Sequence, residues 1–169
     1  EDRGPLIDLH TKILVAAIKC GVTKVATLCM SGGADPMGHD SIVGTNTGMG
    51  WHELSHEDYS IVAARKILQY YANKVAALLA LLDVPEPGTS GTYLDNSIVY
   101  YGNAQSTGDH TYTNRPVLLA GSGGGVMKTN KYIDYAGFQN KGNPLDGRDY
   151  NQLLVTLLQA MGLSESDYY

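Results

Sequence analysis

A long apolar stripe at helical spacing dominates the middle of the chain. Its members recur every three or four residues, the spacing of one face of an α-helix. They are Ala64, Ile67, Leu68, Tyr71, Val75, Leu78, Leu79 and Leu82. Pro85 and Pro87 cannot continue such a helix, so we expect it to end near Asp83. A helix of this length with one apolar face has to pack against another element.

Two further helices are predicted at the ends of the chain. The first carries Leu6, Leu9, Ile13 and Ala17 at helical spacing and is followed by Gly21, a typical C-terminal stop. The last spans residues 150–161 and is ended by Gly162. Together with the central stripe, these patterns predict three long helices.

Short apolar runs between the helices are typical of buried strands. We predict strands at residues 22–30, 96–101 and 116–120, with a short edge strand at 132–135. Helices alternating with buried strands indicate an α/β fold. The predicted fold is therefore a single α/β domain over residues 1–169, with a mostly parallel sheet flanked by helices. Cys20 and Cys29 would lie at the two ends of the first strand, too far apart for a disulfide, and we expect free, buried thiols.

Composition excludes two classes of partner. The 169 residues carry a net charge of −5 and their basic residues do not cluster, which argues against a nucleic-acid surface. Lys74 and Asp83 bracket the longest apolar run, so we expect no membrane span.

One segment concentrates metal-binding side chains. Residues 48–58 contain His52, Glu53 and His56, and a second pair, Asp109 and His110, lies about fifty residues further on. Histidine and carboxylate ligands suit zinc, manganese or iron. We hypothesise that His52, His56, Asp109 and His110 converge on one divalent metal ion, because loops that leave the carboxyl ends of strands meet at one edge of a sheet.

Other uses of these residues stay open. Asp35, His39 and Asp40 are secondary candidates for metal ligands, and all the histidines could instead cap helices and hold loops by hydrogen bonds. The glycine-rich run at residues 121–125 lacks the G-K-[ST] ending of a phosphate loop, and we interpret it as a flexible loop or tight turn.

Residues 52–56 also match the H-E-x-x-H pattern of zinc proteases, in which both histidines project from one helix. The spacing of Ser55 and Asp58 predicts instead that Ser55 is the N-cap of the central helix, with His52 before it. We keep a zinc metalloprotease acting through His52, Glu53 and His56 as an alternative function.

Four segments, residues 20–30, 51–57, 95–125 and 150–168, resemble the bacterial secreted family named for its HXXSHH motif, a domain of unknown function. The motif falls on His52, Ser55 and His56, and Glu57 replaces its last histidine. Tyr112 similarly stands where members tend to have a second histidine after His110. The resemblance covers the C-terminal part of a full-length member.

The family is distantly similar to the alkaline phosphatase and sulfatase superfamily. That similarity implies a sheet flanked by helices, with Asp109 and His110 in the place of a metal-binding pair. The superfamily's nucleophile lies in an N-terminal portion that this chain does not contain. The resemblance therefore implies a piece of a longer precursor, whose missing segment or another polypeptide is the expected partner. A homo-oligomer and a periplasmic or extracellular location are further expectations.

Three function classes follow from the sequence. The chain is a metal-dependent hydrolase of phosphate or sulfate esters or the remnant of one, a secreted structural or surface-assembly protein without catalysis, or a zinc protease. A bound metal separates the first and third classes from the second.

Overall fold

The computed structural model describes residues 3–32, 38–44, 48–56, 61–104, 110, 114–135 and 149–168. The chain divides into two compact units. Unit 1 comprises Glu1–Val84 and Thr107–Thr111, and unit 2 comprises Pro85–Ser106 and Tyr112–Tyr169.

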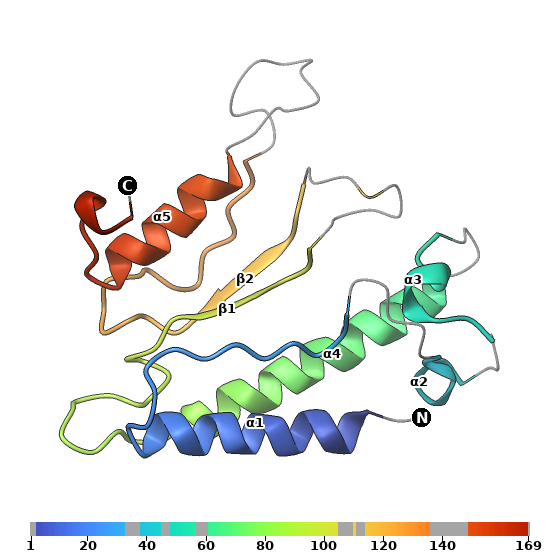
Figure 1. Ribbon diagram of the computed structural model, residues 1–169, viewed down its shortest axis with the longest axis horizontal. Coiled ribbons are helices and arrows are strands. Elements are labelled where there is room, and N and C mark those ends of the chain that lie inside the picture. The colour runs from blue at the N-terminus through green and yellow to red at the C-terminus, as the bar shows by residue number, and fades with distance from the viewer. Residues whose placement is uncertain are drawn as a thin grey trace. The chain divides into compact units, whose positions relative to one another are not determined.

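Unit 1 is helical. Helices α1 (Gly4–Lys19) and α4 (Ile61–Leu82) lie side by side, and the one-turn helices α2 (Asp40–Val43) and α3 (Trp51–Leu54) pack on α4 (Figure 1). The core is formed by the apolar faces that these helices turn toward one another. Its buried cluster consists of Ile7, Val43, Leu54, Ala63, Ile67 and Tyr71.

The helices α1 and α4 confirm the sequence predictions, because their patterns are local. Pro5 stands in the first turn of α1, where its missing N–H costs nothing. Gly21 follows the helix with φ +67°, a left-handed conformation that ends a helix at little cost for glycine. Helix α4 ends at Leu82, directly before Asp83.

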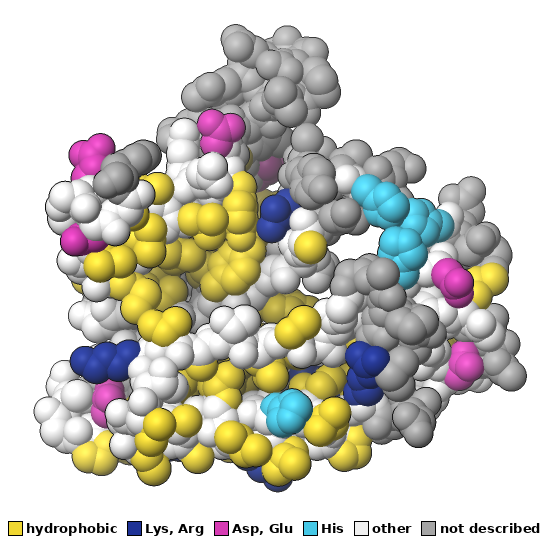
Figure 2. All heavy atoms as spheres, in the orientation of Figure 1, with side chains coloured by type: hydrophobic (Ala, Val, Ile, Leu, Met, Phe, Trp, Pro, Cys, Tyr) yellow, Lys and Arg dark blue, Asp and Glu magenta, His cyan; other side chains and the backbone are white. Residues whose placement is uncertain are grey.

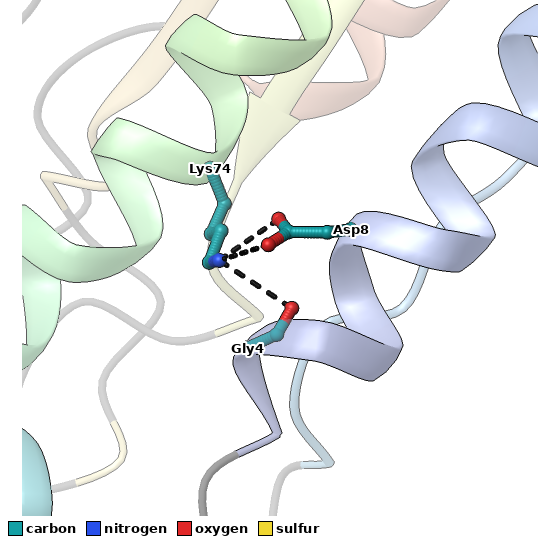
Figure 3. Close-up of polar contacts among 3 residues, drawn as sticks. All are labelled: Gly4, Asp8 and Lys74. Carbon is teal, nitrogen blue, oxygen red and sulfur yellow. Dashed lines mark hydrogen bonds and ion pairs between the residues drawn. The ribbon is translucent and has the colours of Figure 1, made fainter.

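An ion pair joins α1 to α4. The ammonium group of Lys74 lies 2.8 Å and 2.9 Å from the two carboxylate oxygens of Asp8, and it donates a longer bond of 3.4 Å to the carbonyl of Gly4 (Figure 3). The Lys74 side chain is only 17% exposed. Because partial burial reduces screening by water, this pair should contribute more than a fully exposed one.

We therefore expect Asp8→Asn to lower the free energy of unfolding of unit 1 by about 1 kcal/mol. Urea unfolding followed by tryptophan fluorescence measures this, since Trp51 is the only tryptophan of the chain and lies in unit 1. Asp83→Asn, which also removes one carboxylate but breaks no such pair, is the matched control. Equal effects of the two substitutions would show that the contact with Lys74 contributes nothing.

Unit 2 contains a two-stranded antiparallel sheet and one long helix. Strands β1 (Val99–Gly102) and β2 (Val117–Ala120) pair with Val99 opposite Ala120 and Gly102 opposite Val117. Helix α5 (Tyr150–Ala160) follows, and a short 3₁₀ helix, η2 (Glu165–Asp167), lies near the C-terminal end (Figure 1). Gly162 follows α5 with φ +86°, in agreement with the predicted stop.

The predicted mostly parallel sheet is wrong. Two of the predicted strands exist as β1 and β2, but they pair antiparallel, and the described part of the chain contains no other sheet strand. A parallel pair needs a crossover connection, usually a helix, between its strands. Residues 103–116 carry no helical pattern, so the connection suits an antiparallel pair.

The predicted strand at residues 22–30 is also wrong. This segment is extended without strand pairing, and the side chains of Val22 and Val25 are 78% and 71% exposed. The Thr23 side chain takes the place of a strand partner for Val25. Its hydroxyl donates to the carbonyl of Val25 and accepts from the Val25 N–H. Such local bonding competes with sheet formation.

Two smaller predictions fail for related reasons. The thiols of Cys20 and Cys29 are free, as expected, but exposed rather than buried, because no strand carries them into a core. The predicted edge strand at residues 132–135 is not a strand, and Tyr132 is 93% exposed.

No helix in the described ranges combines the length and apolar character needed to cross a bilayer. This agrees with the absence of a membrane span expected from the sequence.

Candidate metal site

The site is built on helix α3 and the turn after it. The N–H of Gly50 donates to the Glu53 carboxylate at 3.1 Å, which satisfies one of the free donors at the start of the helix. Leu54 is almost fully buried, and Trp51 packs against the core of unit 1. These two apolar anchors leave His52 half-buried and His56 exposed.

Ser55 is not the N-cap that the sequence analysis predicted. Its backbone is helical, with φ −71° and ψ −15°, and it forms the C-terminal cap of α3. Its hydroxyl donates to the carbonyl of His52 at 2.6 Å. The contact between Gly50 and Glu53 starts a helical turn earlier than the pattern of Ser55 and Asp58 indicated, and Asp58 lies outside the described residues.

The first two histidines are one helical turn apart. Backbone bonds continue past α3, since the N–H of Ser55 donates to Trp51 and that of His56 donates to Glu53. Spacing of four residues along such a turn places side chains one above the other. The Nε2 atoms of His52 and His56 are 3.4 Å apart.

The third histidine comes from far along the chain. His110 has φ +58°, a left-handed backbone that is uncommon for a residue other than glycine. Its ring stacks on that of His52, with centroids 5.5 Å apart, and meets the ring of His56 edge-on at 4.8 Å. Figure 2 shows a patch of histidine side chains, separate from a smaller histidine area lower on the same face, in agreement with this cluster.

The three side chains form a plausible ligand set by distance alone. One ring nitrogen from each of His52, His56 and His110 lies within 4.8 Å of the others. Two nitrogens bound tetrahedrally to zinc at 2.0–2.1 Å would be about 3.3–3.4 Å apart. The pair formed by His52 and His56 already has this separation.

Comparison with protein families, curated proteins and solved structures yields no match. The resemblance to the HXXSHH family therefore stays a prediction.

The other predicted site residues have different places. Asp109 and Asp35 lie outside the described residues. His39 is buried, and its Nε2 lies 2.9 Å from the hydroxyl of Tyr71, within the core of unit 1. Asp40 begins helix α2. Of the candidates that the structure describes, His52, His56 and His110 come together, while His39 and Asp40 do not join them.

Sequence reasoning missed a second cluster, in unit 2. Tyr100, Arg115 and Tyr150 come from three separate parts of the chain and meet there. No motif or spacing links the three residues, so the cluster could not be found before the chain was folded.

Proposed function

We propose that unit 1 binds a divalent transition metal ion, zinc in the first instance, through His52, His56 and His110. The observation that carries the proposal is the approach of three imidazole nitrogens to within 4.8 Å of one another. The cluster of described residues consists of three histidines. Imidazole ligands favour zinc or a similar transition metal over magnesium or calcium, which prefer oxygen ligands.

Hydrolysis is the activity that this ligand set supports best. Sites with three protein ligands leave a position for water or substrate, and zinc there makes bound water a nucleophile at neutral pH. The exposure of His56 and His110 leaves the cluster accessible to solvent. Phosphate and sulfate esters are the substrate class that we propose.

A peptidase acting through Glu53 is less well supported. In an H-E-x-x-H enzyme the glutamate has to polarise the attacking water. The Glu53 carboxylate accepts the N–H of Gly50, which gives it a role in starting α3. The pair of histidines at helical spacing is shared with such enzymes, but the described contacts of the glutamate do not favour the same use.

The proposal predicts one equivalent of bound zinc. In calorimetric titration of metal-stripped protein, we expect His110→Ala or His52→Ala to weaken zinc binding at least tenfold, since each removes one of three ligands. His10→Ala is the matched control, because His10 is an exposed histidine on α1 outside the cluster. Equal affinity of the His10 and His110 variants, or no binding by the unchanged chain, would contradict the proposal.

Activity is tested separately. Zinc-loaded protein should hydrolyse p-nitrophenyl phosphate or sulfate, and the His110 variant should lose this activity. Stoichiometric zinc without turnover of either ester would instead favour the alternative of a structural protein, in which the ion only holds His110 against α3.

A further inference from the structure

The cluster in unit 2 combines two phenols and a guanidinium group. Tyr100 lies on β1, Arg115 lies just before β2, and Tyr150 is the first residue of α5. The guanidinium carbon of Arg115 is 4.1 Å from the centre of the Tyr150 ring, and the Tyr150 hydroxyl donates to that of Tyr100. Stacking on an aromatic ring fixes the plane of a guanidinium group and leaves its edges available for hydrogen bonds.

A glycine at the end of β1 leaves room for the Tyr100 hydroxyl. A Cβ added to Gly102 would lie 2.5 Å from the Tyr100 hydroxyl oxygen, and Gly102 is not in the left-handed region. Glycine is needed there for the close approach of the hydroxyl, not for its own backbone angles. The Tyr100 hydroxyl is therefore held against the end of its own strand.

The cluster has more donors than acceptors. Within the described ranges, the buried Nε of Arg115 has no hydrogen-bond partner, and Arg115 forms no ion pair there. Asp149 precedes Tyr150 in the chain but does not pair with this guanidinium. The Tyr100 oxygen accepts a hydrogen bond from the Tyr150 hydroxyl, so the hydroxyl hydrogen of Tyr100 remains available to a third group.

The Tyr100 phenol is neutral at neutral pH and can donate its proton in a hydrogen bond. Desolvation is the main cause that raises the pKa of Tyr100, and the nearby Arg115 charge acts in the opposite direction. A neutral phenol and a guanidinium group lying side by side can both donate hydrogen bonds to the same ligand. A partly buried positive charge without a counterion is unfavourable, and a bound anion would relieve this.

We infer that Arg115 and Tyr100, with Tyr150 as the stacking platform, bind a small oxyanion such as a phosphate, sulfate or carboxylate group. Arginine binds such groups with two parallel hydrogen bonds, and the phenol supplies a third. The inference is independent of the zinc proposal, because all three residues belong to unit 2.

Phosphate is the probe for this site. Calorimetric titration with sodium phosphate, in metal-free protein and at ionic strength held constant with chloride, should show one saturable site. Arg115→Gln should weaken binding more than tenfold, and Tyr100→Phe, which keeps the ring and removes the donor, should weaken it about tenfold. Tyr132→Phe removes a hydroxyl from a fully exposed tyrosine and should change nothing.

Two results would overturn the inference. One is the absence of saturable phosphate binding at millimolar concentrations, and the other is unchanged affinity in Tyr100→Phe. If Arg115→Gln does not fold, the tyrosine variant alone decides. His52→Ala should bind phosphate as the unchanged chain does, which keeps this test separate from that of the metal site.

Discussion

Replacing Gly121 by alanine should destabilise unit 2 by about 3 kcal/mol or more, at the upper end of the usual range for a point substitution. Gly121 follows β2 with φ +83°, and an added Cβ would lie 2.2 Å from the carbonyl oxygen of Ser97 and 2.5 Å from that of Leu94. Both are backbone atoms. They are fixed by the turn in which Ser97 donates to Leu94 and Gly123 donates to Ser97.

Gly125→Ala is the control for this prediction. Gly125 has φ +95°, so alanine is strained there too, but nothing lies within 4 Å of its added Cβ. We expect a loss of about 1–2 kcal/mol, the cost of left-handed backbone alone. Hydrogen exchange of the β1 and β2 amides measures both variants, since unit 2 contains no tryptophan. Equal losses would show that the turn relaxes around the new methyl group.

Ile67→Ala should cost unit 1 about 4 kcal/mol, because it leaves a cavity in a packed core. Ile67 is 0% exposed and belongs to the cluster that joins α1, α2, α3 and α4. The loss combines the transfer free energy of the carbon atoms that alanine lacks with the van der Waals contacts that the neighbouring side chains no longer make.

Leu68→Ala tests the same helix one residue further on. Leu68 is 41% exposed, so its truncation should cost less than about 1.5 kcal/mol. Urea unfolding followed by Trp51 fluorescence compares the two variants. A cost for Leu68→Ala that matches or exceeds that for Ile67→Ala would mean that the outer face of α4 is covered in solution.

The helices were predictable because their signals are local. The stripe from Ala64 to Leu82 and the stops at Gly21 and Gly162 act within a few residues of the helix that they define. The sheet was not predictable in the same way. Whether two strands pair parallel or antiparallel depends on the path of the chain between them. The apolar run at residues 22–30 has the pattern of a buried strand, but sequence alone does not show whether another strand pairs with it.

The same division applies to the site. The approach of His52 and His56 follows from helical spacing, and it persists although the predicted start of the helix at Ser55 was wrong. The position of His110 depends on long-range folding and on a left-handed backbone conformation that no sequence pattern predicts. His110 was a candidate because loops at one edge of a mostly parallel sheet were expected to bring it to His52, whereas the described strands pair antiparallel.

His110 belongs to unit 1, although it stands in the connection between the two strands of unit 2. An ion held by His56 and His110 would therefore turn the intervening chain, β1 included, into a closed ring. Ring closure removes conformations from the unfolded chain more than from the folded one. Metal binding would then couple the folding of the two units through the connectivity of the chain.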